Sequence, residues 1–328
     1  MQPGGTKMKF GAFASALLLF SGAAPAHAQD AYPQKPVELV CSTSPGSTAA
    51  QWCQLVAQVL AQDGMLGVPV NVAYKGAGSG NEAAVYVRGK PADGYTILHA
   101  NASWSGYMNL PTFEPSVEDF EYLARIEKFI YALGTHTAMP YQTFGDAVAA
   151  AKEKPGTLAV AGNKIGSIHH KHILSVFKAA DAEAVHIPYE GSGDAVRDVL
   201  GQHVPLGLGS IGQLQPHVEA GNIRPLVVLN EERVAAFPDV PTPAELGYDY
   251  PISHQWQGIF LRAGTPEDIK GKLRDALTKL MDSPEYAEYL KNSPHVEKNF
   301  ETDPAVLKQS LEDEISDYRE FMQANGIL

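Results

Sequence analysis

The sequence predicts an α/β protein with mostly parallel sheets flanked by helices. Short β-prone runs alternate with segments of helical spacing from residue 37 to residue 229, which is the pattern of βαβ units. From Pro266 onward the sequence is nearly all helical. The chain has 328 residues, enough for two ordinary domains or one large one.

The elements follow one another in a regular order. The strand candidates are short, apolar and β-prone: 37–41, 68–74, 96–100, 158–161, 184–187, 204–208 and 225–229. The helix candidates between them have helical spacing of apolar residues: 48–60, 80–87, 143–154, 168–180, 195–201 and 213–220. In the tail, Pro266, Pro284 and Pro304 each suit a first helical turn, and Gly326 suits a C-cap.

The N-terminus predicts export. Lys7 and Lys9 precede an apolar run, 10–24, which ends at the A-x-A site of residues 26–28. This is the pattern of a secretory signal peptide, so we expect residues 1–28 to be removed near Ala28. A stable membrane anchor is the alternative, but the run is short and contains Gly and Ser.

The charge balance excludes a nucleic-acid partner. The formal net charge is −12 at pH 7, and phosphate binding needs a basic footprint. If the protein binds an anion, local dipoles must attract it, because the overall field is repulsive.

The two cysteines, Cys41 and Cys53, flank a turn rich in hydroxyls. In an exported protein an even pair is a disulfide candidate, and two buried thiols are the alternative. The sequence has no C-x-x-C and no paired histidines close by, so we expect no metal.

Glycine-rich turns follow most of the predicted strands. They combine glycine with hydroxyl or amide side chains, and they cover 42–50, 75–83, 101–109, 162–170, 189–195 and 209–217. In parallel sheets such turns leave backbone N–H groups at helix N-termini, which suits an anion. One such turn would indicate only an N-cap, but several together favour a shared carboxylate site.

No motif indicates catalysis. Residues 76–81 (GAGSGN) lack the last glycine of a dinucleotide loop, and the chain has neither a G-x-S-x-G elbow nor a Walker loop. His169, His170 and His172 do not have the i, i+4 spacing of a helical zinc pair. We therefore expect no enzyme activity and no cofactor.

Taken in order, a series of short motifs resembles the periplasmic solute receptors of tripartite tricarboxylate transporters, the Bug or TctC-like proteins. The likeness runs through essentially the whole chain after the leader. The matching stretches are 32–37 (YPQKPV), 45–48 (PGST), 76–81 (GAGSGN), 91–96 (PADGYT), 186–191 (HIPYEG), 237–245 (FPDVPTPAE) and 264–266 (GTP).

The resemblance implies a two-lobed periplasmic binding protein of the type II, Venus-flytrap class. Lobe 1 would comprise residues 29–131 and 254–328, and lobe 2 residues 132–253. Such a receptor closes on a small carboxylate in the periplasm and delivers it to integral membrane transporter subunits. We expect a monomer.

The resemblance also implies which turns hold the ligand. The matching positions are Ser44, Gly46, Ser47, Thr48, Gly166, Ser167, Gly191 and Ser192. To these we add Ser103, Trp104, His170 and Tyr189 as candidate binding residues, from the third, fourth and fifth turns.

Two departures from the family pattern bear on the ligand. The acidic position of the first turn is Ala50, which argues against an amino acid. If Trp104 and either Trp52 or Tyr189 face the cleft, they offer flat apolar surfaces. We therefore expect an aromatic or partly apolar carboxylate, such as a phthalate isomer. The alternative is that Trp104 belongs to the core.

Two other functions stay open at this point. An exported α/β hydrolase would need a Ser–His–acid set in hydrogen-bond reach. A ligand-dependent sensor partner would use the same hinge closure as a transport receptor, so the sequence does not separate the two.

Overall fold

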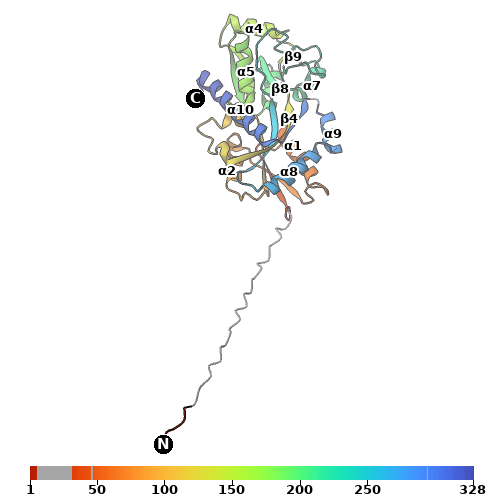
Figure 1. Ribbon diagram of the computed structural model, residues 1–328. Coiled ribbons are helices and arrows are strands. Elements are labelled where there is room, and N and C mark those ends of the chain that lie inside the picture. Colours follow the sequence, from red (N-terminus) through yellow and green to blue (C-terminus); the bar gives the residue numbers. More distant parts are fainter. Residues whose placement is uncertain (6–31, 46, 294) are drawn as a thin grey trace. The chain divides into compact units, whose positions relative to one another are not determined.

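The computed structural model describes residues 1–5, 32–45, 47–293 and 295–328. The expected signal peptide, 1–28, lies largely outside the described residues. Residues 33–328 form one compact unit, which is the part described below (Figure 1). Within the described residues, no helix has both the length and the apolar character needed to cross a bilayer.

The first sheet has six strands in the order β11-β4-β10-β3-β1-β2. Strand β1 pairs in parallel with β2 and β3, whereas β10 and β11 make antiparallel pairs. The strands are β1 (Val37–Cys41), β2 (Val70–Tyr74), β3 (Thr96–Asn101), β4 (Phe120–Phe129), β10 (Gln255–Arg262) and β11 (Val296–Glu301).

The second sheet has five strands in the order β7-β6-β8-β5-β9. Strand β6 pairs in parallel with β7 and β8, and β5 is antiparallel to both of its neighbours. The strands are β5 (Tyr131–His136), β6 (Leu158–Asn163), β7 (Ala184–Tyr189), β8 (Leu206–Ser210) and β9 (Ile223–Leu229).

Both sheets are therefore mixed, and not mostly parallel as the sequence predicts. The expected strands form, but β4, β5, β10 and β11 were not predicted, and each of them makes antiparallel pairs. Only Ile130 separates β4 from β5, so the chain passes directly from one sheet to the other at that point.

Helices flank each sheet, and we call each sheet with its helices a lobe. The first lobe has α1 (Thr48–Leu60), α2 (Asn81–Arg88), α3 (Ser103–Tyr107), α8 (Glu267–Leu280), α9 (Pro284–Lys291) and α10 (Pro304–Ala324). The second lobe has α4 (Phe144–Glu153), α5 (Ile168–Ala179), α6 (Ser192–Leu200) and α7 (Ile211–Glu219). Two 3₁₀ turns, η1 (Ala77–Gly80) and η2 (Val117–Asp119), lie in the first lobe.

Capping residues explain where several helices begin. Ser47 accepts a hydrogen bond from the backbone N–H of Ala50 at the start of α1, and Thr143 and Asp146 form a capping box at α4. Asp303 caps α10 by accepting from two backbone N–H groups. These local signals place the helix N-termini at fixed points beside the sheet edges.

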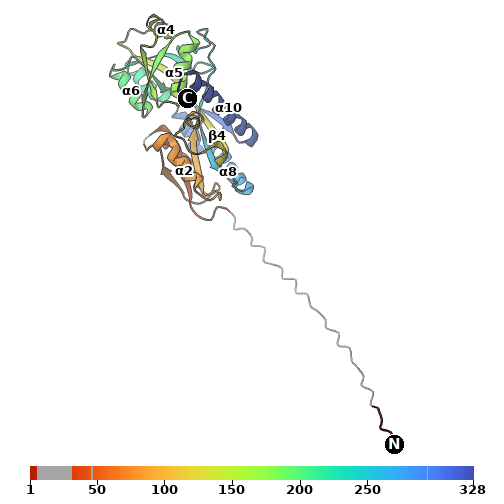
Figure 2. The same ribbon diagram turned by 90° about the vertical axis from the view of Figure 1, so that its left-hand side faces the viewer.

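Helix α10 belongs to the first lobe but also reaches the second. It contacts α3 and β4, and its Phe321 ring lies edge-on to His170 of α5 at 5.5 Å. Figures 1 and 2 both show α10 running beside α5. The C-terminal helix therefore connects the two lobes in addition to the chain crossings.

Candidate functional site

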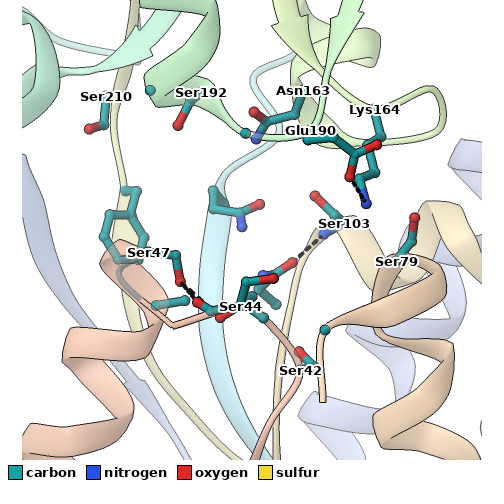
Figure 3. A pocket seen from close by; sticks show the side chains of 18 of the residues that line it. Ser42, Ser44, Ser47, Ser79, Ser103, Asn163, Lys164, Glu190, Ser192 and Ser210 are labelled. Carbon is teal, nitrogen blue, oxygen red and sulfur yellow. Dashed lines mark hydrogen bonds and ion pairs between the residues drawn. The ribbon is translucent and has the colours of Figure 1, made fainter. Parts of the chain in front are cut away.

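A cavity of about 500 Å³ lies between the two lobes, within the size range of small-molecule sites. Its walls are the turns that follow β1, β2 and β3 in the first lobe and β6, β7 and β8 in the second. Figure 3 shows hydroxyl and amide side chains from both lobes facing this space. These are the glycine-rich turns predicted from the sequence to form a carboxylate site.

The first-lobe wall is a network of hydroxyls before α1. The Ser47 hydroxyl donates to the Ser44 carbonyl at 3.0 Å and lies 3.0 Å from the Thr43 hydroxyl. It also accepts from the Ala50 N–H at 3.1 Å. Because Ser47 is held by three partners, the turn presents its neighbours Thr43 and Ser44 to the cavity in a fixed arrangement.

The second-lobe wall contains a helix N-terminus without a side-chain cap. Gly191 is the N-cap of α6 and has no side chain to accept from the first N–H groups of that helix. The Ser192 hydroxyl is turned sideways, where it accepts from the Gln213 amide at 2.7 Å. The N–H groups of Asp194 and Ala195 donate to the Gly191 carbonyl, so those of the first two residues of α6 are the ones available to an anion in the cavity.

The charged side chains at the cavity come from the second lobe. Among the described lining residues Lys164 is the single cation, and its Nζ lies 2.8 Å from Glu190. The Glu190 side chain is 85% exposed and that of Lys164 30%. Such an exposed ion pair is weak, so a ligand carboxylate could replace Glu190 at low cost.

Aromatic residues form a further part of the wall: Trp104, Tyr107, Phe129 and Tyr131. Most of the Trp104 ring is packed in the core against Phe113 and Phe120, at 5.5 and 5.8 Å. Its indole N–H has no hydrogen-bond partner among the described residues. A Cβ at Gly80 would lie 2.7 Å from that nitrogen, so only glycine leaves room for the indole there.

The structure brings half of the predicted binding residues to the cavity. They are Ser44, Ser47, Ser103, Trp104, Gly191 and Ser192. Gly46 and the side chain of Thr48 lie outside the described part of the structure. The remaining predictions, Gly166, Ser167, His170 and Tyr189, do not line the cavity.

Local hydrogen bonds explain why those four residues are turned away. Ser167 is buried as the N-cap of α5 and accepts from the His170 N–H at 3.3 Å. The His170 ring accepts from the Gly166 N–H at 3.1 Å and stacks on His186. The Tyr189 hydroxyl donates to Asp198 at 2.6 Å. These residues shape the turns behind the cavity wall.

Trp52 is also away from the cavity. It is fully buried, and its ring lies 5.2 Å from that of His99. The flat surface was expected from Trp104 with either Trp52 or Tyr189. The aromatic residues that line the cavity with Trp104 are instead Tyr107, Phe129 and Tyr131.

Several lining residues were not selected from the sequence. Asn163, Lys164, Ser210 and Gln213 lie in the predicted glycine-rich turns, so the sequence indicated the turn but not the side chain. Gln255 and Gln257 come from β10, a strand that was not predicted. Polar residues at alternate positions of a buried strand were the signal that could have found them.

Ser42 and His99 make the serine–histidine contact nearest to a hydrolase arrangement. The Ser42 hydroxyl lies 3.4 Å from His99 Nδ1, and the other ring nitrogen contacts the Gln257 amide oxygen. An amide cannot stabilise an imidazolium as the carboxylate of a catalytic triad does. The set therefore lacks the acid that a hydrolase needs.

Comparison with known proteins assigns the family. The model of the tripartite tricarboxylate transporter family receptor, TctC, matches residues 54–327. The chain belongs to this family. It is 32% identical over 253 residues to protein BugT of Bordetella pertussis, covering 75% of this chain and 76% of that protein. The family is one of receptors of tripartite tricarboxylate transporters.

Solved structures agree with the two-lobed α/β fold. MatC from Rhodopseudomonas palustris with bound malate superposes with a TM-score of 0.77 at 22% identity, over 88% of this chain and 99% of MatC. A protein from R. palustris solved with adipate gives 0.78 at 25% identity, over 90% and 98%. The fold prediction is confirmed at this level.

Proposed function

We propose that this TctC-family protein captures a small carboxylate between its lobes in the periplasm and delivers it to the membrane subunits of a tripartite tricarboxylate transporter. It acts as a monomer without catalysis. Lobe 1 comprises residues 29–131 and 254–328, lobe 2 residues 132–253, and the leader is removed near Ala28. Closure of the lobes around the acid is the event that the transporter detects.

The observation that carries this proposal is the uncapped N-terminus of α6 at the cavity. A carboxylate there would accept from the free N–H groups of α6 and from hydroxyls of the facing first-lobe turn. Closure would exclude water and strengthen those hydrogen bonds. The ligand would thus shift the equilibrium between the open and closed forms toward the closed form, by its extra affinity for that form.

The lining supports a ligand with an apolar middle and a second polar end. The aromatic residues Tyr107, Phe129 and Tyr131 offer apolar surface, and Lys164 could receive a second carboxylate in place of Glu190. Relatives of this fold hold malate and adipate, both small dicarboxylates. An aromatic mono- or dicarboxylate, such as a phthalate isomer, is the second candidate because of those rings.

Calorimetric titration tests the proposal. The full protein is titrated with malate, adipate, citrate, the phthalate isomers and amino acids, and with the neutral dimethyl ester of the best acid. We expect one-to-one binding of at least one free acid and no binding of its ester. Binding of amino acids alone, or of none of the acids, would contradict the carboxylate assignment.

Two variants of one residue locate the anion. Ser192 is the first residue of α6, and Gly191 before it is extended (φ −154°, ψ 155°), so proline fits at position 192 without breaking the helix. Ser192→Pro removes the backbone N–H, whereas the matched control Ser192→Ala removes only the hydroxyl. We expect a loss of affinity of about tenfold or more for proline beyond that for alanine. Equal affinities would show that α6 does not hold the carboxylate.

A further inference from the structure

Two thiols and one imidazole meet behind the first-lobe wall of the cavity. Cys41 ends β1, Cys53 lies in the second turn of α1, and His99 lies in β3. One donor atom from each residue lies within 4.8 Å of the other two, and all three residues are fully buried. Both cysteines are free thiols in the structure, so the disulfide expected as a candidate is not formed there.

The orientation of His99 is set from its far side. Its Nε2 contacts the side-chain oxygen of Gln257, which can only accept, so Nε2 carries the proton. Nδ1 then carries a lone pair, which faces the Ser42 hydroxyl at 3.4 Å and the Cys41 sulfur at 3.9 Å. Fixing the tautomer of a histidine through a hydrogen bond to its other nitrogen is what partners of metal-binding histidines do.

The donor set and its charge select the ion. Two thiolates and a neutral imidazole are preferred ligands of Zn²⁺, and their two negative charges would neutralise it. A neutral assembly is the form in which charges are tolerated in a fully buried site. Two ligands of one tetrahedral zinc lie about 3.5–3.8 Å apart, given bonds of about 2.0–2.3 Å. The observed spacing approaches this, so small side-chain rotations suffice.

We propose that Cys41, Cys53 and His99 form a zinc site that ties together β1, α1 and β3. The same three elements border the ligand cavity, because its lining includes Ser42 after β1, the N-cap residue of α1 and Asn101 at the end of β3. A bound ion would fix the turn between β1 and α1 from behind. The sequence did not indicate this site, since His99 comes 58 positions after Cys41.

Metal uptake by the full, reduced protein tests the site. The protein is freed of metal, incubated with ZnCl₂ alone and dialysed, and bound zinc is measured by plasma mass spectrometry. A parallel sample takes CoCl₂. We expect one zinc per chain, and for cobalt a thiolate charge-transfer band with the visible spectrum of a tetrahedral ion. Zinc should also raise the melting temperature of the wild type, and a chelator should reverse the rise.

Variants separate this site from surface binding. Cys53→Ser and His99→Gln should each lower zinc affinity by about tenfold or more. The control His203→Gln alters an imidazole that is 73% exposed and should leave affinity unchanged. The proposal is overturned if folded wild type takes up no zinc, or if both variants bind it as well as wild type. It is equally overturned if protein isolated without reductant has no alkylatable thiols and a mass two hydrogens lower, because a disulfide then occupies the position.

Discussion

Glu127 carries a buried carboxyl group near the C-terminal end of β4. Its two oxygens accept from the Tyr286 and Tyr289 hydroxyls, at 3.2 and 3.0 Å, and the residue is fully buried. Burial raises its pKa from 4.5 to about 8, because this effect is larger than that of the tyrosine hydrogen bonds, which lower the pKa. The folded protein therefore holds this proton more tightly than the unfolded chain does.

The raised pKa of Glu127 predicts a pH dependence of stability. The contribution of protonated Glu127 to the free energy of unfolding is fully present below about pH 4.5 and is lost as pH rises through about 8. Each unit of difference between the folded and unfolded pKa corresponds to roughly 1.4 kcal/mol. Glu127→Gln keeps an acceptor without the charge, so it should be more stable than wild type at pH 8 and lack this slope. Urea unfolding of both proteins from pH 5 to pH 9 measures the effect. Parallel profiles across that range would contradict the prediction.

Also at the residue scale, the sequence predicts the turns that face the ligand more accurately than it predicts the individual side chains. Ser44, Ser47 and Ser192 were predicted from the resemblance to TctC-like receptors, and all three line the cavity. Ser167 caps α5 just as Ser47 caps α1, yet Ser47 lines the cavity whereas Ser167 is fully buried behind its wall. The difference lies in how the neighbouring segments pack over each turn, and residue type alone does not determine that.

At the scale of elements, two of the four missed strands, β4 and β10, share one property. β4 contains the buried Glu127 and β10 contains the glutamines Gln255 and Gln257, so neither is a simple apolar run. Their polar side chains find partners on α9, in the cavity wall or on His99, all distant in sequence. Predicted strands such as β1 and β2, or β6 and β7, pair within one βαβ unit and needed no such knowledge.

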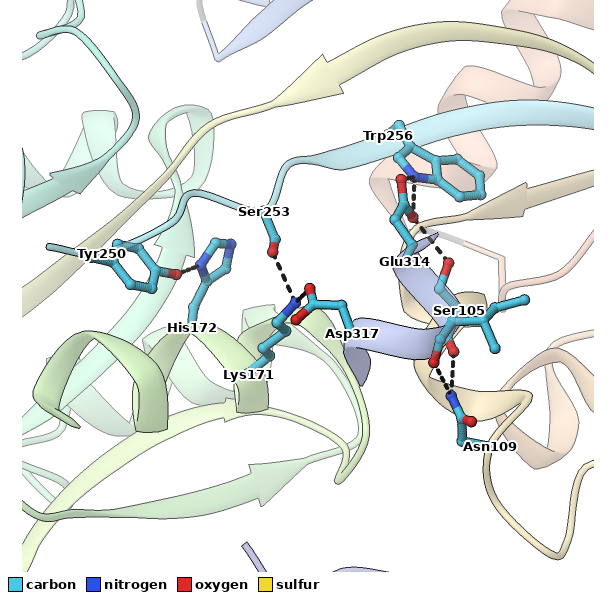
Figure 4. Close-up of polar contacts among 10 residues, drawn as sticks. Ser105, Asn109, Lys171, His172, Tyr250, Ser253, Trp256, Glu314 and Asp317 are labelled. Atoms are coloured by element: carbon cyan, nitrogen blue, oxygen red, sulfur yellow. Dashed lines mark hydrogen bonds and ion pairs between the residues drawn. The ribbon is translucent and has the colours of Figure 1, made fainter. Parts of the chain in front are cut away.

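Helix α10 is attached to β10 by a buried polar contact, shown in Figure 4. The Trp256 indole N–H lies 2.8 and 3.0 Å from the two carboxylate oxygens of Glu314. Ser105 of α3 donates to the same carboxylate at 3.0 Å. Burial raises the pKa of Glu314, so removing a donor would leave a costly unsatisfied acid.

A double-mutant cycle measures this attachment. Trp256→Phe should destabilise the wild type by about 1–3 kcal/mol, because it removes the donor to a buried carboxylate. In a Glu314→Leu background the same change should cost less, since no acceptor remains. We expect a coupling free energy of about 1 kcal/mol or more from urea unfolding of the four proteins. Additive effects within about 0.5 kcal/mol would show that the contact does not hold α10 to β10.

At the scale of the whole unit 33–328, the lobes meet closely on one side of the cavity. The backbone N–H of Ile168 lies 3.4 Å from the Ser103 hydroxyl, and Lys171 pairs with Asp317 of α10 and donates to Ser253 (Figure 4). We infer that closure pivots on this packed side.

Gly106 is where the packed side leaves no space for a side chain. A Cβ there would collide with the Gly166 carbonyl oxygen of the second lobe and lie 2.9 Å from the Tyr318 ring of α10. Both obstacles are backbone or buried ring, so the lobes themselves must move apart. Gly106→Ala should therefore cost about 1–3 kcal/mol of stability and weaken carboxylate binding, by about tenfold for each 1.4 kcal/mol lost from the closed form.

The matched control is Gly271→Ala in α8, where a Cβ meets nothing within 4 Å. That change should leave binding unaltered and stabilise the helix by about 0.5–1 kcal/mol, because alanine loses less backbone entropy. Calorimetry with the best-binding acid and small-angle scattering with and without it measure both variants. If Gly106→Ala closes and binds as Gly271→Ala does, the pivot lies elsewhere, since a side chain at the contact of the two lobes cannot be neutral to a rotation about it.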